Sequence, residues 1–179
     1  MMRYTCMLRA VNVSGQRKVS MAALRELCVS LGHADVETYL QSGNVIFSSK
    51  KSQAKLGPSL SAAIAERFGY ADVDVLVWTA AELAALIRAN PFAVRHCDVS
   101  KLHVTFLAKD VGAAPLKGIG ADAYLPDEFA SAPRAIYVHC PNGYGRTKLN
   151  NAFFERKLGT RATTRNWQSV NNLCQLAGK

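Results

Sequence analysis

The chain has 179 residues, of which 49% are hydrophobic and 20% charged, and its 22 lysines and arginines outnumber its 13 acidic residues. This composition is typical of a globular protein and excludes a fibrous or intrinsically disordered chain. No apolar run approaches the roughly 20 residues of a membrane-spanning helix, and the first residues lack a signal-peptide pattern, so we expect a cytoplasmic protein with no membrane partner. The five cysteines are odd in number and widely spaced, which favours reduced core thiols over a disulfide framework.

The first part of the chain alternates between strand-like and helix-like segments. Ser20 is placed to cap the first helix and Gly32 to end it, and residues 42–44 have the composition of a tight turn between two strands. Pro58 disfavours the helical interior, so we expect the second helix to begin near Ser59. The expected segments are strands at 3–9, 36–40, 45–47 and 73–78, and helices at 21–31 and 59–68.

The second part of the chain predicts a similar set of elements. Thr79 and Glu82 have the spacing of a capping box that opens a helix, and Asn90 followed by Pro91 ends that helix. The expected segments are helices at 80–89, 113–119, 146–158 and 166–177, and strands at 101–107 and 134–140. The likeness between the two halves indicates a structural duplication.

These elements predict an α+β chain of two ferredoxin-like subdomains, each of the β-α-β-β-α-β type. We expect the first at 1–79, a connecting helix and linker at 80–92, and the second at 93–179. RNA-recognition modules share this order and expose aromatic side chains on their sheets. Here only Phe47, with Tyr39 on the neighbouring strand, is placed to stack on a base, which disfavours sequence-specific RNA recognition.

Positive charge is concentrated at the two ends of the chain. The formal net charge of +9 divides into +5 for residues 1–25, −2 for residues 26–143 and +6 for residues 144–179. Such segregation predicts a site for an anion where both ends of the chain meet.

A glycine-rich segment, residues 143–145, lies between an expected strand and the expected helix at 146–158. Backbone N–H groups in such a turn can bind phosphate, with Arg146, Thr147 and Lys148 in the first helical turn. The order of these residues does not match a nucleotide-binding P-loop, which needs a Gly-Lys pair. Glycine turns between strands and helices are common, so the segment alone leaves a purely structural interpretation open.

The helix expected at 146–158 carries polar residues on its apolar side. At about 100° per residue, Arg146, Asn150 and Lys157 fall within the arc of the hydrophobic side chains. A buried charge needs a partner, so these residues are expected either to form an internal polar network or to line a cleft. Glu155 falls on the opposite side, where we expect an exposed partner for an arginine.

The last expected helix offers a second anion-binding terminus. Thr163 or Thr164 is placed to cap it, and Arg165 and Asn166 flank its start. A structural role, in which Arg165 and Asn166 tie the helix to the sheet, is the alternative.

Metal and nucleophile sites find little support. The two His-Cys pairs, His96-Cys97 and His139-Cys140, are adjacent in sequence. Since neighbours on a strand point to opposite faces, neither pair can chelate a metal in a regular strand. No nucleophile elbow is present. We predict no metal and no cofactor.

The chain resembles the bacterial family known as domain of unknown function 1697, through one signature near each end. The first signature comprises Leu8-Arg9, Asn12-Val13, Gly15, Lys18, Met21, Leu24, Thr38-Tyr39, Gln41-Ser42-Gly43-Asn44-Val45 and Phe47. The second comprises Lys148-Leu149, Asn151, Glu155, Lys157-Leu158-Gly159, Thr163, Arg165-Asn166-Trp167 and Val170. The resemblance implies two ferredoxin-like halves and no established activity. The sequence departs from the family pattern at Ala10 and Ser14, where glycine is usual, and at Ser20, where proline is common.

The leading functional hypothesis is a basic patch, formed by both chain ends, that binds a phosphate-bearing polyanion such as nucleic acid. The alternatives are an enzyme acting on a small phosphorylated or nucleotide-like substrate, and a non-catalytic interaction domain. An open basic surface would favour nucleic acid, and a pocket of a few hundred Å³ would favour a small ligand. The candidate anion-binding residues are Arg9, Asn12, Lys18, Arg146, Lys148, Asn150, Lys157, Arg165 and Asn166.

Overall fold

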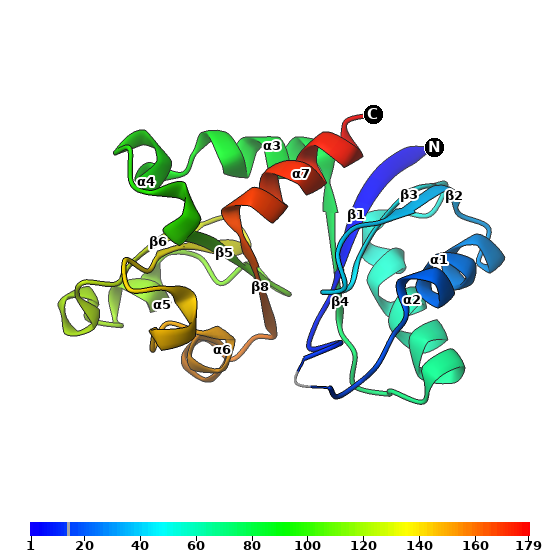
Figure 1. Cartoon of the computed structure of the whole chain (residues 1–179), viewed down its shortest axis with the longest axis horizontal. Coiled ribbons are helices and arrows are strands. Elements are labelled where there is room, and N and C mark those ends of the chain that lie inside the picture. The colour runs from blue at the N-terminus through cyan, green and yellow to red at the C-terminus, as the bar shows by residue number, and fades with distance from the viewer. Residues whose placement is uncertain (14) are drawn as a thin grey trace. The chain divides into compact units, whose positions relative to one another are not determined.

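The computed structural model describes residues 1–13 and 15–179 (Figure 1). The chain forms two compact units, one of Met1–Leu83 with Leu173–Lys179 and the other of Ala84–Asn172. Each unit contains one four-stranded antiparallel sheet with helices against it. The predicted α+β class with two helix-flanked sheets is therefore confirmed. The predicted division at 1–79, 80–92 and 93–179 stays a prediction.

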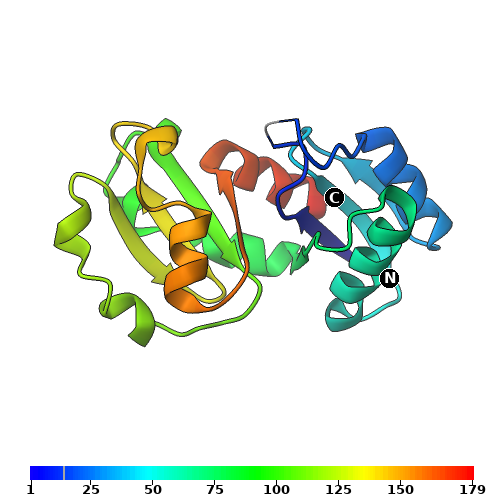
Figure 2. The same cartoon turned by 90° about the horizontal axis from the view of Figure 1, so that it is seen from below.

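The first unit follows the expected β-α-β-β-α-β order. Its sheet has the order β2-β3-β1-β4, in which β1 pairs antiparallel with both β3 and β4. Helices α1 and α2 lie against one face of the sheet (Figure 2). The elements are β1 (Met2–Leu8), α1 (Met21–Ser30), β2 (Ala34–Thr38), β3 (Asn44–Ser49), α2 (Gln53–Phe68) and β4 (Val75–Thr79).

Local signals explain how several of these elements begin and end. The Ser20 side chain caps α1 by accepting a 3.0 Å hydrogen bond from Ala23 N, as predicted. At the β2–β3 turn, Gly43 has a φ of 76°, and a Cβ there would lie 2.9 Å from the Cβ of Leu8. Only glycine satisfies both the backbone conformation and the close approach to β1.

Helix α2 begins earlier than the predicted start at Ser59. It runs from Gln53, with Pro58 in its second turn and Ser52 as its N-cap residue. Leu56 and Gly57 are both buried, so packing against the sheet stabilises the first turn despite the hydrogen bond that proline cannot donate.

A short helical segment follows the first sheet. The predicted capping box opens α3 (Ala80–Arg88), because Thr79 N donates to Glu82 Oε2 over 2.7 Å and Glu82 N donates to Thr79 Oγ1 over 3.2 Å. The helix ends before Asn90, whose side chain caps α4 (Pro91–Val94). The 3₁₀ turn η1 (Val99–Lys101) then leads into the second sheet.

The second sheet repeats the arrangement of the first. Its order is β6-β7-β5-β8, and β5 pairs antiparallel with β7 and β8. Helices α5 and α6 lie on one side of it and α4 on the other (Figure 1). The elements are β5 (Leu102–Leu107), α5 (Ala114–Lys117), η2 (Ala121–Tyr124), β6 (Glu128–Ala132), β7 (Ala135–His139), η3 (Tyr144–Arg146), α6 (Asn151–Leu158), β8 (Ala162–Asn166) and α7 (Trp167–Ala177), of which the last part, from Leu173, belongs to the first unit.

Two strands of this sheet, β6 and β8, were not among the predicted segments. The helix expected at 146–158 also starts later, at Asn151, because the side chain of Asn150 accepts a 3.0 Å hydrogen bond from Phe153 N and so caps α6. Likewise, Thr163 and Thr164 lie in β8 and do not cap the last helix. That cap is Asn166, whose Oδ1 accepts a 2.8 Å hydrogen bond from Ser169 N.

The remaining general features concern thiols and membranes. All five cysteines are free, and Cys6, Cys28 and Cys140 are buried. Among the described residues, no helix has the length and apolar character needed to cross a bilayer.

Candidate functional site

A polar groove on the second unit, here called the Arg146 groove, is the candidate site. Its volume is about 430 Å³. Two segments form its walls, the one that leads into β6 and the one that follows β7. The lining residues are Ala123, Tyr124, Leu125, Pro126, Asp127, Asn142, Arg146 and Lys148.

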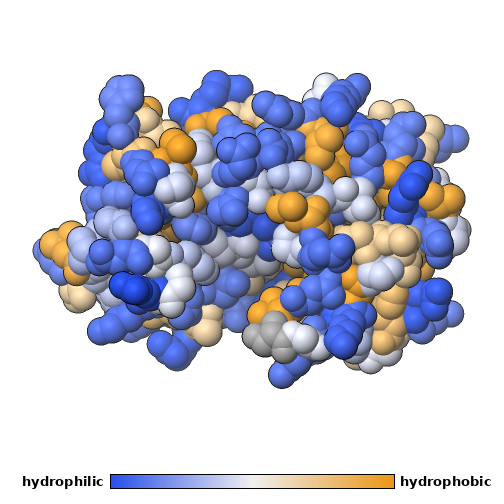
Figure 3. Space-filling model, in the orientation of Figure 1, coloured by the Kyte–Doolittle hydropathy of each residue, from blue (hydrophilic) through white to orange (hydrophobic). Residues whose placement is uncertain are grey.

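The β6–β7 hairpin brings these walls together. Glu128 pairs with His139 at the open end of the hairpin. The residues just before β6 therefore lie beside the residues just after β7. On the face shown in Figure 3, the second unit is mostly hydrophilic, with apolar residues in small separate groups.

The segment after β7 is held in shape by a compact turn. Gly143 has a φ of 91°, its N–H donates to Cys140 O over 2.9 Å, and its carbonyl accepts from Arg146 N over 3.1 Å. The Thr147 hydroxyl then accepts a 3.0 Å hydrogen bond from Leu149 N. Arg146 thus belongs to the 3₁₀ turn η3, and Lys148 lies between η3 and α6.

A network of hydroxyl groups fixes η3 to the sheet. The Tyr144 hydroxyl donates to Thr164 Oγ1 over 3.0 Å, and Thr164 donates to Asn151 Oδ1 over 2.5 Å. Thr105 Oγ1 lies 2.8 Å from Thr164 Oγ1, and the His103 ring stacks on Tyr144 with centroids 4.6 Å apart. Burial raises the pKa of Tyr144 above its usual value. The phenol therefore stays neutral and anchors the turn that carries Arg146.

The opposite wall combines an aromatic ring with a carboxylate. The peptide bond between Leu125 and Pro126 is cis, and Asp127 N donates to Tyr124 O over 2.9 Å. The Tyr124 and Phe153 rings form a T-shaped contact, with centroids 5.1 Å apart and planes at 65°. Tyr124 and Asp127 are both half-buried.

The lining contains two exposed cations and one carboxylate. Arg146 and Lys148 are exposed, and within residues 1–13 and 15–179 neither makes a side-chain hydrogen bond or an ion pair. Asp127 is the single acid among the lining residues. The groove therefore offers uncommitted donors to an anion and one acceptor to a hydrogen-bond donor.

The structure corrects the interpretation of the apolar arc on α6. Arg146 precedes the helix, Asn150 is its cap, and Lys157 is exposed in its last turn. None of the three is buried, so no internal polar network arises from them. Of the predicted set, Arg146 and Lys148 lie together in the groove, whereas Asn150 and Lys157 do not line it. Glu155 is half-buried and accepts a 2.8 Å hydrogen bond from Ala162 N.

Arg165 and Asn166 are the last two residues of β8, and their role in binding an anion stays a prediction. Arg165 is 7% exposed, and its Nη1 donates to Thr163 Oγ1 over 2.8 Å and to Thr164 O over 2.9 Å. Burial lowers the pKa of Arg165 to about 10. Asn166 is exposed and caps α7.

The other predicted residues belong to the first unit. Arg9 is half-buried after β1, and Lys18 is exposed. Asn12 Nδ2 donates to Val19 O over 2.8 Å and to Gln41 O over 2.7 Å, so its amide hydrogens are already used within the first unit. The patch that was predicted to join both chain ends stays a prediction.

Ala10 and Phe47, both in the first unit, were also singled out from the sequence. Ala10 adopts a φ of 55°, which suits the glycine usual at this place in the resembled family, whereas Ser14 lies outside the described residues. Phe47 is 0% exposed and stacks on His33 with centroids 4.2 Å apart, so it is not a platform for an RNA base.

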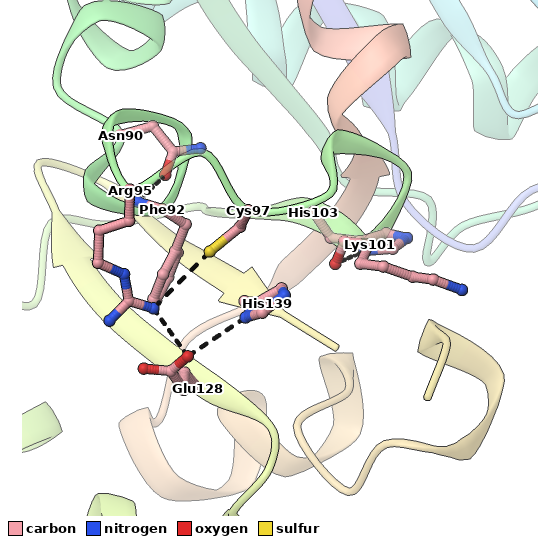
Figure 4. A network of polar contacts seen from close by, with 8 residues as sticks. All are labelled: Asn90, Phe92, Arg95, Cys97, Lys101, His103, Glu128 and His139. Carbon is pink, nitrogen blue, oxygen red and sulfur yellow. Dashed lines mark hydrogen bonds and ion pairs between the residues drawn. The ribbon is translucent and has the colours of Figure 1, made fainter. Parts of the chain in front are cut away.

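A second polar cluster, which the sequence did not reveal, links the segment after α4 to β6 and β7 (Figure 4). Glu128 Oε1 accepts a 2.8 Å hydrogen bond from Arg95 Nη2 and lies 3.2 Å from His139 Nδ1. The hydrogen bond from Arg95, followed by that from His139, lowers the pKa of Glu128. Arg95 lies 5.0 Å over the Phe92 ring and 3.9 Å from Cys97 Sγ. The cluster ties the segment after α4 to the edge strand β6.

Comparisons with known proteins give a family and a fold. The profile of the family described as "Protein of unknown function (DUF1697)" matches residues 1–137. A solved structure of a conserved bacterial protein from Streptococcus pneumoniae is similar over 98% of each chain, with 22% identity and a TM-score of 0.76. No curated protein matches the chain.

Proposed function

Because the chain belongs to the family described as protein of unknown function (DUF1697), we propose a function from its own side chains: it binds a phosphate-bearing ligand in the Arg146 groove. The observation that carries this proposal is the pairing of Arg146 with Lys148 in one hollow, where neither cation has a partner among the described residues. Arginine presents a planar set of donors that fits phosphate oxygens, and lysine adds a point charge.

The size of the groove favours a small ligand over a long one. A volume of about 430 Å³ falls within the range of roughly 300–1,000 Å³ that is usual for small-molecule sites. A small phosphorylated or nucleotide-like molecule therefore suits the groove best.

The test is calorimetric titration of the purified chain with inorganic pyrophosphate and with nucleoside monophosphates. Replacing both Arg146 and Lys148 by Ala should weaken binding by at least about tenfold, since each hydrogen bond to a charged group contributes roughly 1.5–3 kcal/mol. The matched control replaces Lys117 and Arg156, two exposed cations of the same unit outside the groove, and removes the same charge.

Two results would contradict the proposal. One is a wild-type chain that binds neither pyrophosphate nor a nucleotide at low salt. The other is a control variant that loses as much affinity as the groove variant, which would mean that net charge alone attracts the anion. Circular dichroism checks that both variants fold.

Nucleic acid is the second candidate ligand, and the segregation of charge supports it. Residues 144–179 carry +6 and residues 1–25 carry +5. A polyanion with one phosphate in the Arg146 groove could use the other exposed cations along its length. Its signature is a steep dependence of affinity on salt, with a slope of about −0.9 per phosphate contact for duplex DNA.

A further inference from the structure

The Arg146 groove contains two groups that a bare phosphate does not use, Tyr124 and Asp127. On the premise that the groove binds phosphate, we propose that its ligand is a nucleoside phosphate whose base presents an amino group to the Asp127 carboxylate. The inference rests on the proposed function and names the class of ligand for the same site.

Asp127 restricts the ligand chemically. A carboxylate in the wall of an anion site repels phosphate, so its presence favours a ligand that carries a hydrogen-bond donor at that place. Within the described part of the chain Asp127 makes no side-chain hydrogen bond or ion pair, and it is half-buried. Its oxygens only accept hydrogen bonds. An amino group on the ligand satisfies them, whereas a carbonyl oxygen would face them unfavourably.

Tyr124 supplies the aromatic surface that a base requires. Its T-shaped contact with Phe153, with ring centroids 5.1 Å apart, holds the ring in the groove wall. Nucleic-acid bases of every kind stack on such rings. Phosphate, a flat ring and an amino donor occur together in the nucleotides of adenine, guanine and cytosine.

Two nucleotide pairs test the role of the carboxylate. CMP differs from UMP, and AMP from IMP, by an exocyclic amino group in place of a carbonyl oxygen and by a bare ring nitrogen in place of the neighbouring ring N–H. We expect the wild type to bind CMP and AMP about tenfold or more tightly than UMP and IMP, because a hydrogen bond to a charged group is strong. Asp127→Asn should remove this preference, since an amide both donates and accepts. Asp122→Asn, an exposed aspartate of η2 outside the groove, is the matched control and should retain it.

Ribose 5-phosphate separates base recognition from phosphate recognition. Tyr124→Ala should weaken the binding of all four nucleotides by about fivefold or more and should leave ribose 5-phosphate unchanged. The inference is overturned, and the proposed function kept, if pyrophosphate binds but the members of each pair bind equally. It is also overturned if the only effect of Asp127→Asn is that nucleotide binding no longer depends on Mg²⁺, because the carboxylate would then bind a cation and not an amino group. Absence of any phosphate binding would overturn both proposals.

Discussion

His33 is a buried histidine whose environment opposes protonation. It is 6% exposed, its ring stacks on Phe47, and its Nε2 has no hydrogen-bond partner among the described residues. Burial, and then the charge of Lys51, lower the pKa of His33 below the ordinary value of 6.5. Because protonating this ring costs free energy in the folded state, the stability of the first unit should depend on pH.

The sign of this dependence follows from the lowered pKa. Just below the ordinary value of 6.5, the unfolded chain binds a proton at His33 and the folded chain does not. The free energy of unfolding should therefore fall as the pH drops from about 7 towards 5. Urea unfolding across this range measures it. His33→Phe keeps the stacked ring without a titrating group, and it should lose less stability on acidification. If its curve runs parallel to that of the wild type, another group causes the loss.

Some residues could be interpreted correctly from local patterns alone. Ser20, Thr79 and Glu82 cap their helices as their spacing predicted, because a cap depends on neighbours within three residues. Arg146 and Lys148 were selected by charge, and both line the groove, while their role in binding an anion stays a prediction. Tyr124, Asp127 and Asn142 were missed because only the pairing of Glu128 with His139 brings their segments side by side.

At the scale of elements, Asn150 tests whether a predicted ligand residue is structural. Its side chain accepts a 3.0 Å hydrogen bond from Phe153 N at the start of α6. Asn150→Ala should lower the free energy of unfolding by roughly 0.5–2 kcal/mol, and Asn150→Asp should lower it by less. Chemical denaturation provides the measurement. The affinity for pyrophosphate should not change with Asn150→Ala, since Asn150 does not line the groove. A variant of unchanged stability but weakened binding would contradict the assignment.

The elements that the sequence predicted wrongly are those defined by distant partners. Strand β8 contains two threonines and a buried arginine, a composition that also suits the start of a helix. The segment forms a strand because it pairs with β5, with Thr164 opposite Thr105. Helix α6 was extended back to Arg146 because helical periodicity continues through Asn150, yet the Asn150 side chain bonds the backbone as a cap. In α2, burial of the first turn outweighs the effect of Pro58.

At the scale of the whole molecule, charge segregation and the groove predict different ligands. The groove involves only the second unit, whereas the +5 of residues 1–25 lies in the first. A mononucleotide in the groove needs none of the cations of the first unit. A polyanion that contacts both units needs some of them. The two ligands can therefore be separated by variants on one unit at a time.

Lys18 and Lys148 make this comparison, because both are exposed lysines and they lie on different units. Lys148→Ala should weaken mononucleotide binding and also lower the salt slope for duplex DNA by about 0.9, the value for one lost phosphate contact. Lys18→Ala should leave mononucleotide binding unchanged. If both chain ends bind one polyanion, Lys18→Ala should reduce the DNA salt slope by the same amount, about 0.9. Fluorescence anisotropy between roughly 50 and 200 mM salt covers the range in which such slopes are measured. An unchanged slope for Lys18→Ala would remove Lys18 from the predicted patch. If the wild type does not bind DNA at all, the binding of a small ligand in the Arg146 groove is the function that remains.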